Sequence, residues 1–374
     1  MHKLRISFHR RHSGNLVATF LLLFFSGWAL AQPGGAGELA RAYAGLDQEQ
    51  SGKEAKAAYR KTVNASWLTY QQRIAKPMSE WAKKEIAFPG GNTIFYPFSG
   101  PDLVTVVQLF PDAERYVLVA MQKARAPVDI RALADAERRA FNDKFNTEWR
   151  KFGTLGYFRT NDLDEDSRNK QVRIGITPIL MAFAARLGYD VIEVSPIALS
   201  AETGDFEKIA GQEDGAWDSV RITLSKAGKK VNVDYVRMNL SDSAFKSRER
   251  ARAWIERMAA NPVLLKAASH LLQEPGFSVV RDAIVTAAPI VVQDETGLEF
   301  EQLGKIGEVS LYGGFTRSHK LFVHSTQHSL AVAYRNTRKV GELPFAFSYN
   351  KASNQRSMQI AKRKNLQQKA KPVA

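Results

Sequence analysis

The stretch Thr93–Asp102 reads TIFYPFSGPD, an aromatic run that leads into a Ser-Gly-Pro-Asp corner. The aromatic part predicts a strand, and Pro97 confines it to a sheet edge or to the end of the strand. Beyond the corner, apolar residues recur at helical spacing and predict a short helix: Leu103, Val106, Val107 and Phe110. The corner therefore joins a strand to a helix.

This corner has a structural and a functional interpretation. In the structural one, Ser99 is the N-cap of the helix, Asp102 follows three residues later as in a capping box, and Pro101 lies in the first turn. A nucleophile elbow would need glycines two residues on either side of Ser99, and neither is present. The structural interpretation is favoured. An anion site at this helix start would need an arginine from elsewhere, and Arg159 is the candidate.

Patterns along the rest of the chain predict further elements. Helices are expected over 38–86 (divided at Pro77), 128–151, 176–188, 244–259, 262–273, 277–287 and 328–336. Strands are expected at RYVLVAM, YDVIEV, EVSLYGGF, LPFAFSYN and SMQIAKRK, with a hairpin over 217–238 and a strand-turn-strand at PIVVQDETGLEF. Together they predict an α+β fold, in which a helical N-terminal segment precedes a mixed or largely antiparallel sheet with packed helices.

The first residues have the features of a secretory signal peptide. A basic stretch without acids precedes the apolar run LVATFLLLFFSGWAL, and Ala29-Leu30-Ala31 matches a cleavage site. The apolar run is shorter than the roughly twenty residues that span a bilayer. We expect cleavage after Ala31 and a periplasmic or secreted location, with no transmembrane helix in the mature chain. The predicted parts are the signal peptide 1–31, the helical segment 32–90, the α+β core 91–361 and a basic tail 362–374.

Composition restricts the partners that we expect. The chain has no cysteine, so no disulfide can form, and its net charge is +15. The terminal segment AKRKNLQQKAKPVA is basic without acids, which makes an anionic envelope polymer or a lipid surface the candidate partner. Nucleic acid is not expected, because the protein is exported and its basic residues are not interleaved with aromatic ones. No cofactor is expected.

Two other groups of residues are candidate sites. His319, His324 and His328 are close in sequence, but no Asp or Glu lies between Glu308 and Glu342 to complete a metal shell, so no metal site is expected. Asp294 and Glu295 are adjacent carboxylates after an apolar run, and they could perform acid–base chemistry if one were desolvated. The simpler interpretation is a turn, since Asp, Thr and Gly are turn residues.

Segments of this chain resemble a family of exported bacterial proteins of unknown function that carry an FYPFSGPD motif. The resemblance covers most of the mature chain, in this order: FYPFSGPD, YFRTNDLD, VDYVRMNLSD, LKAASHLL, VVQDETGLEF with VSLYGG, and LPFAFSYN. The family pattern usually reads Gln-Asp-Asp-Ser-Gly in the fifth segment, where this chain has a longer acid, Glu295, and then Thr296. The resemblance implies no activity, cofactor or catalytic residue.

Three functions follow as hypotheses, in order of preference. The first is a non-catalytic exported protein that binds an envelope component or a small ligand, with these candidate contacts: Tyr96, Ser99, Asp102, Arg159, Asp162, Gln293 and Asp294. The second is a hydrolase of an envelope-derived substrate that acts through Asp102 and Asp294, with help from Glu295 and with Arg159 as anion holder. The third is a structural or interaction protein of the envelope, which predicts an exposed apolar stripe over residues 67–81.

Overall fold

The structure is a computed structural model that describes residues 35–47, 54–86, 92–155, 175–211, 215–319, 322, 327–347 and 355–363. All of these lie in the unit Ala31–Ala374. The predicted signal peptide, the segment that carries Arg159 and Asp162, His324 and the tail beyond Arg363 lie outside the described residues.

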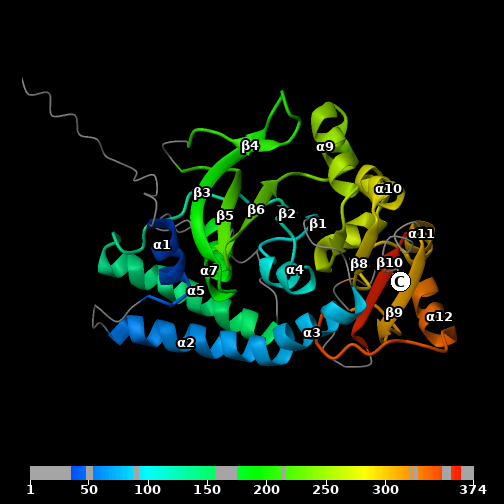
Figure 1. Ribbon diagram of the computed structural model, residues 1–374, viewed down its shortest axis with the longest axis horizontal. Helices are drawn as coiled ribbons and strands as arrows, with labels where there is room; N and C mark the ends of the chain where they lie inside the picture. The colour runs from blue at the N-terminus through cyan, green and yellow to red at the C-terminus, as the bar shows by residue number, and fades with distance from the viewer. Residues whose placement is uncertain are drawn as a thin grey trace, which may run out of the picture. The chain divides into compact units, whose positions relative to one another are not determined.

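The described strands form one mixed sheet, shown in Figure 1, in the order β4-β3-β5-β6-β2-β1-β7-β8-β10-β9. The α+β fold with a mixed sheet after a helical segment is thereby confirmed. The strands are β1 (Thr93–Pro97), β2 (Arg115–Ala120), β3 (Asp190–Leu199), β4 (Phe206–Lys208), β5 (Ser219–Lys226), β6 (Lys229–Arg237), β7 (Val263–Leu265), β8 (Ile290–Gln293), β9 (Glu308–Gly313) and β10 (Ser357–Lys362).

The five central strands of this sheet are parallel. The pairs among them, β6 with β2, β2 with β1, β1 with β7 and β7 with β8, are parallel. Antiparallel pairs extend the sheet on both sides: β5, β3 and β4 follow beyond β6, and β10 and β9 follow beyond β8. Numbered along the chain, the parallel strands have the order 3-2-1-4-5, which is the order of doubly wound sheets. The strand of the TIFYPFSGPD stretch therefore lies in the middle of the sheet, where the chain changes direction between β1 and β7.

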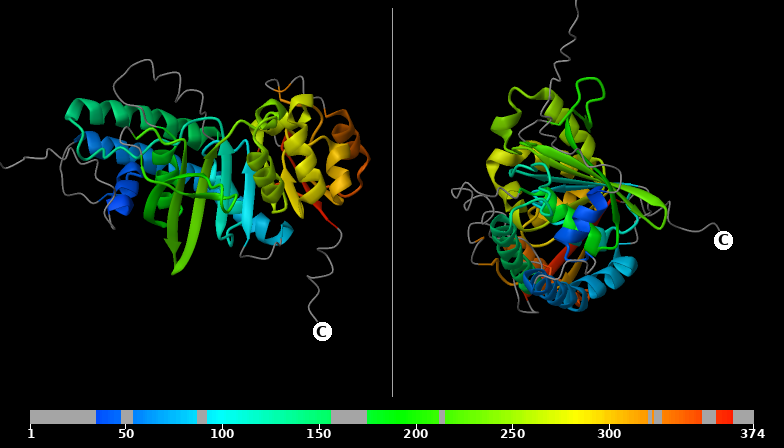
Figure 2. Two further views of the ribbon diagram at one scale, coloured as in Figure 1. Left: turned by 90° about the horizontal axis from the view of Figure 1, so that it is seen from above. Right: turned by 90° about the vertical axis from the view of Figure 1, so that its left-hand side faces the viewer.

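Helices cover both faces of the sheet. Along β1, Ile94 and Tyr96 belong to one hydrophobic core and Phe95 to the other. The first face is covered by α1 (Gly35–Tyr43), α2 (Glu54–Tyr70), α3 (Lys76–Glu85), α4 (Leu103–Leu109), α5 (Asp135–Leu155) and α7 (Thr177–Arg186); the second is covered by α8 (Asp242–Phe245), α9 (Glu249–Ala259), α10 (Ser278–Ala287) and α11 (Phe300–Ile306). In Figure 2, α2 (blue) and α5 (green) lie side by side in both views.

The N-terminal helices share the core of the sheet. Between α2 and α3 the chain forms a π-helical turn, Gln71–Ala75, which ends two residues before Pro77. Proline lacks the N–H that would continue the regular helical pattern, so the predicted division at Pro77 is confirmed. The aromatic stripe over residues 67–81 is buried, which is not the exposure that the third hypothesis requires: Trp67, Tyr70, Ile74, Met78 and Trp81.

Several predicted elements differ from the structure. The segment 262–273 is not a helix: it forms β7 followed by a 3-10 helix, Ala267–Gln273. The sequence does not predict this strand, because a short run that is buried on both faces lacks the alternation that marks a strand. PIVVQDETGLEF continues into α11 instead of a second strand. α5 begins only at Asp135, and residues 343–347 of LPFAFSYN form no strand. The hairpin over 217–238 and the helix over 328–336, α12 (His328–Asn336), are as predicted.

The helix start after β1 also differs. The N-cap of α4 is Asp102, whose Oδ1 accepts the Thr105 N–H at 3.3 Å, so the prediction of Ser99 as N-cap is wrong. Ser99 still extends β1, because its N–H bonds to the carbonyl of Val119. The chain then turns through Gly100 at φ +55°, which delays the helix by three residues and places Pro101 before the N-cap.

Candidate functional site

The carboxyl ends of β1, β7 and β8 lie at one edge of the sheet, because these neighbouring strands are parallel. Ligands of doubly wound sheets bind outside this edge, at the point where the strand order reverses. In this chain that point lies between β1 and β7. The first polar residues after the three strands are Ser99, Lys266 and Asp294, and Asp102 follows at the start of α4.

Lys266 and Asp102 form an ion pair at this edge. The Lys266 ammonium lies 3.0 Å from Asp102 Oδ2 and donates to the hydroxyl of Thr105 at 3.2 Å. The ring of Phe347 lies beneath the ammonium at 5.5 Å. Asp102 Oδ2 also accepts the hydroxyl of Tyr96 at 3.0 Å. Both charged side chains are less than a tenth exposed, so the pair is desolvated and held in one geometry.

Asp294 lies next to this pair. Its Oδ1 accepts the N–H and the hydroxyl of Thr296, which makes the turn that the sequence predicts, and its Oδ2 accepts the N–H of Ala267 at 3.3 Å. Asp294 is fully buried. Burial raises the pKa of Asp294, and the bonds from Thr296 and the charge of Lys266 oppose this shift only in part. The shift makes the neutral acid more favourable for Asp294 than it is for a solvent-exposed aspartate.

Glu295 and the side-chain amides of Gln293 and Gln327 hold the backbone of the Asp294 turn. The Gln293 side chain bonds to both the N–H and the carbonyl of Leu298, at 2.9 Å each. A Cβ at Gly297 would lie 2.4 Å from Gln293 Oε1, so only glycine fits there. Glu295 Oε2 accepts the hydroxyl of Ser357 at 2.8 Å, and the Gln327 amide donates to the Glu295 carbonyl at 3.0 Å. The Gln293 side chain thus holds the two ends of the turn together.

Ser99 does not have the surroundings of a nucleophile. Its hydroxyl donates to the carbonyl of Gly100 at 2.9 Å and lies 3.4 Å from that of Val119. A catalytic serine needs a base that accepts its proton, and these bonds use the hydroxyl for the backbone instead.

The Tyr70 hydroxyl, in contrast, is buried without a hydrogen-bond partner in the part of the chain that the structure describes. Burial raises the pKa of Tyr70, and the Asp102 carboxylate adds to this shift, which places the hydroxyl within electrostatic reach of the Lys266–Asp102 pair. A buried hydroxyl without a partner costs about 1–3 kcal/mol, so its presence needs a reason.

Two non-glycine residues at the ends of β1 and β7 have left-handed backbone conformations. Phe98, directly after β1, has φ +60°, and Ala267, directly after Lys266, also has φ +60°. Such conformations cost about 1–3 kcal/mol each and are concentrated at functional sites. The two aspartates hold the second of these turns: Asp294 accepts the Ala267 N–H, and Asp102 bonds to the side chain of Lys266, the residue directly before it.

The structure thus brings Tyr96, Asp102 and Asp294 together, with Gln293 at the base of the same turn, and Ser99 stays bonded to the backbone. Sequence reasoning missed Lys266, Phe347 and Tyr70. Lys266 is the single charge in the apolar run VLLKAA, and a lysine in such a run is a signal of a buried, paired charge. The helix predicted over this segment gave no reason to single it out. Phe347 and Tyr70 carry no such signal, since an aromatic residue is ordinary in a core.

Metal binding and membrane crossing find no support in the described ranges. No three His, Asp or Glu side chains there could jointly hold a metal ion. No helix in the same part of the chain combines the length and the apolar character that a membrane crossing requires.

Comparisons with known proteins add little to this geometry. No family model matches the chain, and no curated protein matches it. A solved structure of a Porphyromonas gingivalis W83 protein proposed to be a methyltransferase is 9% identical with a TM-score of 0.29, and the match covers 75% of this chain. The chain spans about half of that protein, 53% of its length. A likeness this weak supports no inference about fold or function.

Proposed function

We propose that this protein binds a small polar ligand at the carboxyl edge of β1, β7 and β8, without catalysing its conversion. One observation carries the proposal: four segments far apart in sequence converge on Lys266. They contribute Asp102, Lys266 itself, the Asp294 turn and the ring of Phe347. These segments are among those in which the chain resembles exported bacterial proteins.

The energetics of the ion pair support a role other than stability. Replacing a buried ion pair with apolar residues is often neutral or stabilising by about 1–4 kcal/mol, so folding alone does not require it. A preorganised charge pair with strained turns on both sides is instead what a binding site uses, because its groups need no reorganisation when the ligand arrives. The partnerless hydroxyl of Tyr70 would gain a hydrogen bond from a polar ligand.

A hydrolase that acts through Asp102 and Asp294 is the alternative. One observation favours it: the raised pKa of Asp294 keeps that carboxyl protonated to higher pH, as a general acid requires. Asp102 is less suited to be the base, because Tyr96, Lys266 and Thr105 already donate to its carboxylate. Turnover of envelope-derived substrates that is lost in Asp294→Asn would establish this alternative.

Export is part of the proposal. The signal peptide predicted over residues 1–31 would deliver the protein to the periplasm or the medium. N-terminal sequencing of the protein from the periplasmic fraction should begin at Gln32. A chain recovered in the cytoplasm with its first thirty residues intact would contradict export.

The binding proposal is tested with three variants: Asp102→Asn, Lys266→Met and the double variant. Asp102→Asn alone leaves the buried ammonium unpaired and should cost about 3–5 kcal/mol in the free energy of unfolding. The double variant removes both charges, and the amide that replaces the Asp102 carboxylate keeps an oxygen for the Thr105 N–H. The double variant should therefore recover most of that loss.

Ligand response then separates a binding site from a structural pair. Thermal shifts are measured with peptidoglycan fragments and glycerol phosphates. The wild type should be stabilised by at least one compound, and the folded double variant by none. A double variant that responds like the wild type would show that the pair is structural, and a wild type that responds to no compound would refute this choice of ligands.

A further inference from the structure

A second feature, separate from Lys266, is a pocket of about 570 Å³ between the β3–β4 hairpin and the start of α9. Its lining comprises Leu199, Phe206, Arg237, Met238 and residues 247–251. Leu199 ends β3 and Arg237 ends β6, and these two strands run parallel to each other because both are antiparallel to β5. The pocket therefore lies at the same edge of the sheet as the carboxyl ends of the central strands.

The polar side of the pocket is cationic. Three arginines line it, Arg237, Arg248 and Arg250, against one acid, Glu249. Arg237 pairs with Asp218 at 3.0 Å and donates through Nε to the carbonyl of Met121. Neither Arg248 nor Arg250 has an ion-pair partner among the residues that the structure describes. Two of the three guanidinium groups are thus available to an anion.

The backbone adds donors on the same side. α9 begins at Glu249, and its N-cap is Arg248, whose side chain makes no capping hydrogen bond. Arginine is not among the side chains that cap helices well, and the first N–H groups of a helix lack intrahelical acceptors. Residues 248–251, which carry these N–H groups and two of the guanidinium groups, line the pocket, and a helix start of this kind favours an anion.

The opposite side of the pocket is apolar. Leu199, Phe206, Met238 and Ala251 supply this surface. Phe206 packs against the Trp254 ring at 5.0 Å, so this wall continues into the core between the sheet and α9. A free inorganic anion would gain nothing from such a wall, whereas an anion attached to an apolar group would bury that group there.

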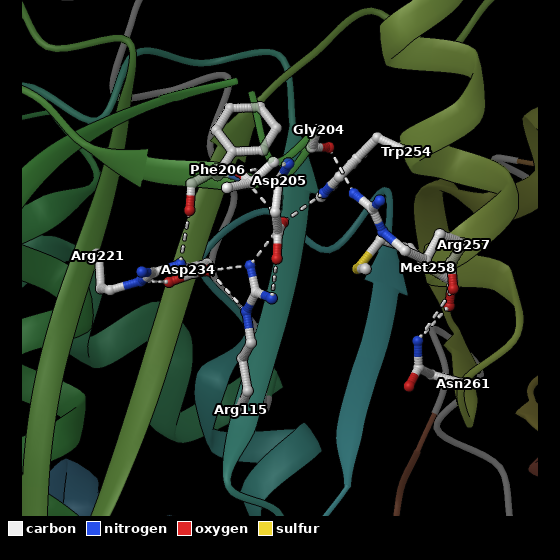
Figure 3. Close-up of polar contacts among 11 residues, drawn as sticks. Arg115, Gly204, Asp205, Phe206, Arg221, Asp234, Trp254, Arg257, Met258 and Asn261 are labelled. Carbon is white, nitrogen blue, oxygen red and sulfur yellow. Dashed lines mark hydrogen bonds and ion pairs between the residues drawn. The ribbon is translucent and has the colours of Figure 1, made fainter. Parts of the chain in front are cut away.

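A charge network fixes the hairpin that forms this wall, as Figure 3 shows. Arg115 holds Asp205 with two hydrogen bonds, at 2.6 and 3.1 Å, and also bonds to Asp234. Arg221 holds the other side of Asp234 at 2.6 Å. The Trp254 indole donates to Asp205 at 2.9 Å, which ties the hairpin to α9. The two walls of the pocket are thereby connected to each other and to the sheet.

From these observations we infer that this pocket binds an amphipathic anion, a phosphate or carboxylate attached to an apolar chain or ring. The anionic head lies between Arg248, Arg250 and the start of α9, and the apolar part lies on Leu199 and Met238. The inference does not depend on the Lys266 site. A lipid headgroup and a soluble phosphate monoester share this chemistry, so the experiment has to distinguish them.

Calorimetry with three probes tests the inference: octyl phosphate below its critical micelle concentration, inorganic phosphate, and vesicles of phosphatidylglycerol with phosphatidylcholine. Octyl phosphate should bind at least about tenfold more tightly than inorganic phosphate, because its methylene groups leave water for the apolar wall. The inference would be overturned if octyl phosphate did not bind and if vesicles still bound variants that lack the pocket arginines. Basic residues outside the pocket would then be the ones that contact a membrane surface.

Variants locate the binding. Arg248→Gln and Arg250→Gln should each weaken octyl phosphate about tenfold, since each removes a charge-assisted hydrogen bond. Arg252→Gln is the matched control: it lies on the same helix, is exposed and pairs with Glu256 outside the pocket. Leu199→Asp should abolish binding by placing a carboxylate on the apolar wall. Equal affinity of the Arg250 and Arg252 variants, or of octyl and inorganic phosphate, would overturn the inference.

Discussion

At the scale of single residues, Asp205 shows how charge holds the wall of the pocket. Burial alone would raise its pKa, but the hydrogen bonds and charge of Arg115 and the bond from Trp254 outweigh burial and lower the pKa to about 2. An unfolded Asp has a pKa of about 3.9. Because the folded pKa is the lower one, the stabilisation is present above about pH 4 and is lost as the pH falls through 2.

Asp205→Asn should therefore lower the free energy of unfolding by about 1 kcal/mol at pH 6, a modest value because the Asp205 side chain is 30% exposed. The difference from the wild type should shrink between pH 4 and pH 2, where the wild-type carboxylate also becomes neutral. Urea unfolding at pH 6, 4, 3 and 2 measures it. A difference that does not change with pH would show that the charge of Asp205 contributes nothing.

At the scale of one element, α9 is a helix whose start is better suited to a ligand than to stability. Asp102 caps α4 with a backbone ψ of 52°, and Arg248 occupies the N-cap of α9 with a similar ψ of 60°. An aspartate at position 248 could therefore accept an N–H of α9 in the same way, and its charge would also suit the helix dipole.

Arg248→Asp should raise the free energy of unfolding by about 1 kcal/mol and weaken octyl phosphate binding more than Arg248→Gln does. Chemical denaturation and calorimetry on the same preparations give the two quantities. Arg248→Gln serves as the reference for loss of the arginine without a new cap. A destabilised Arg248→Asp protein would mean that the start of α9 needs a cation for its own structure.

At the scale of the whole molecule, Trp81 joins the N-terminal helices to the C-terminal part of the sheet. Its indole donates to the carbonyl of Glu342 at 3.0 Å, and its ring packs edge-on against Tyr312 and Phe345. The described N-terminal helices and the sheet share one hydrophobic core, so they should unfold together.

Trp81→Ala should lower the free energy of unfolding by about 3–5 kcal/mol and keep a single transition that coincides in circular dichroism and tryptophan fluorescence. Leu68→Ala, on the exposed side of α2, is the control and should change stability little. Separate transitions of the helical segment and the sheet would contradict the shared core.

The sequence by itself determined the features that depend on neighbours along the chain. The α+β class, the hairpin β5–β6 with Gly228 at φ +77°, the division of the helix at Pro77, and α12 all follow from local pattern and turn chemistry. The Asp294 turn is of the same kind, since Asp, Thr and Gly form it within four residues. Such features depend on backbone preferences that each short segment carries with it.

Only the tertiary structure decided which segments meet. β7 has three residues and no alternation, so its place beside β1 arises from pairing with two neighbouring strands, and Lys266 reaches Asp102 only through that pairing. In the same way, Arg237 and Arg248 line one pocket because the end of β6 and the start of α9 lie next to each other in the fold. Side-chain chemistry is written in the sequence, but proximity between distant residues is a property of the sheet order, which no local pattern encodes.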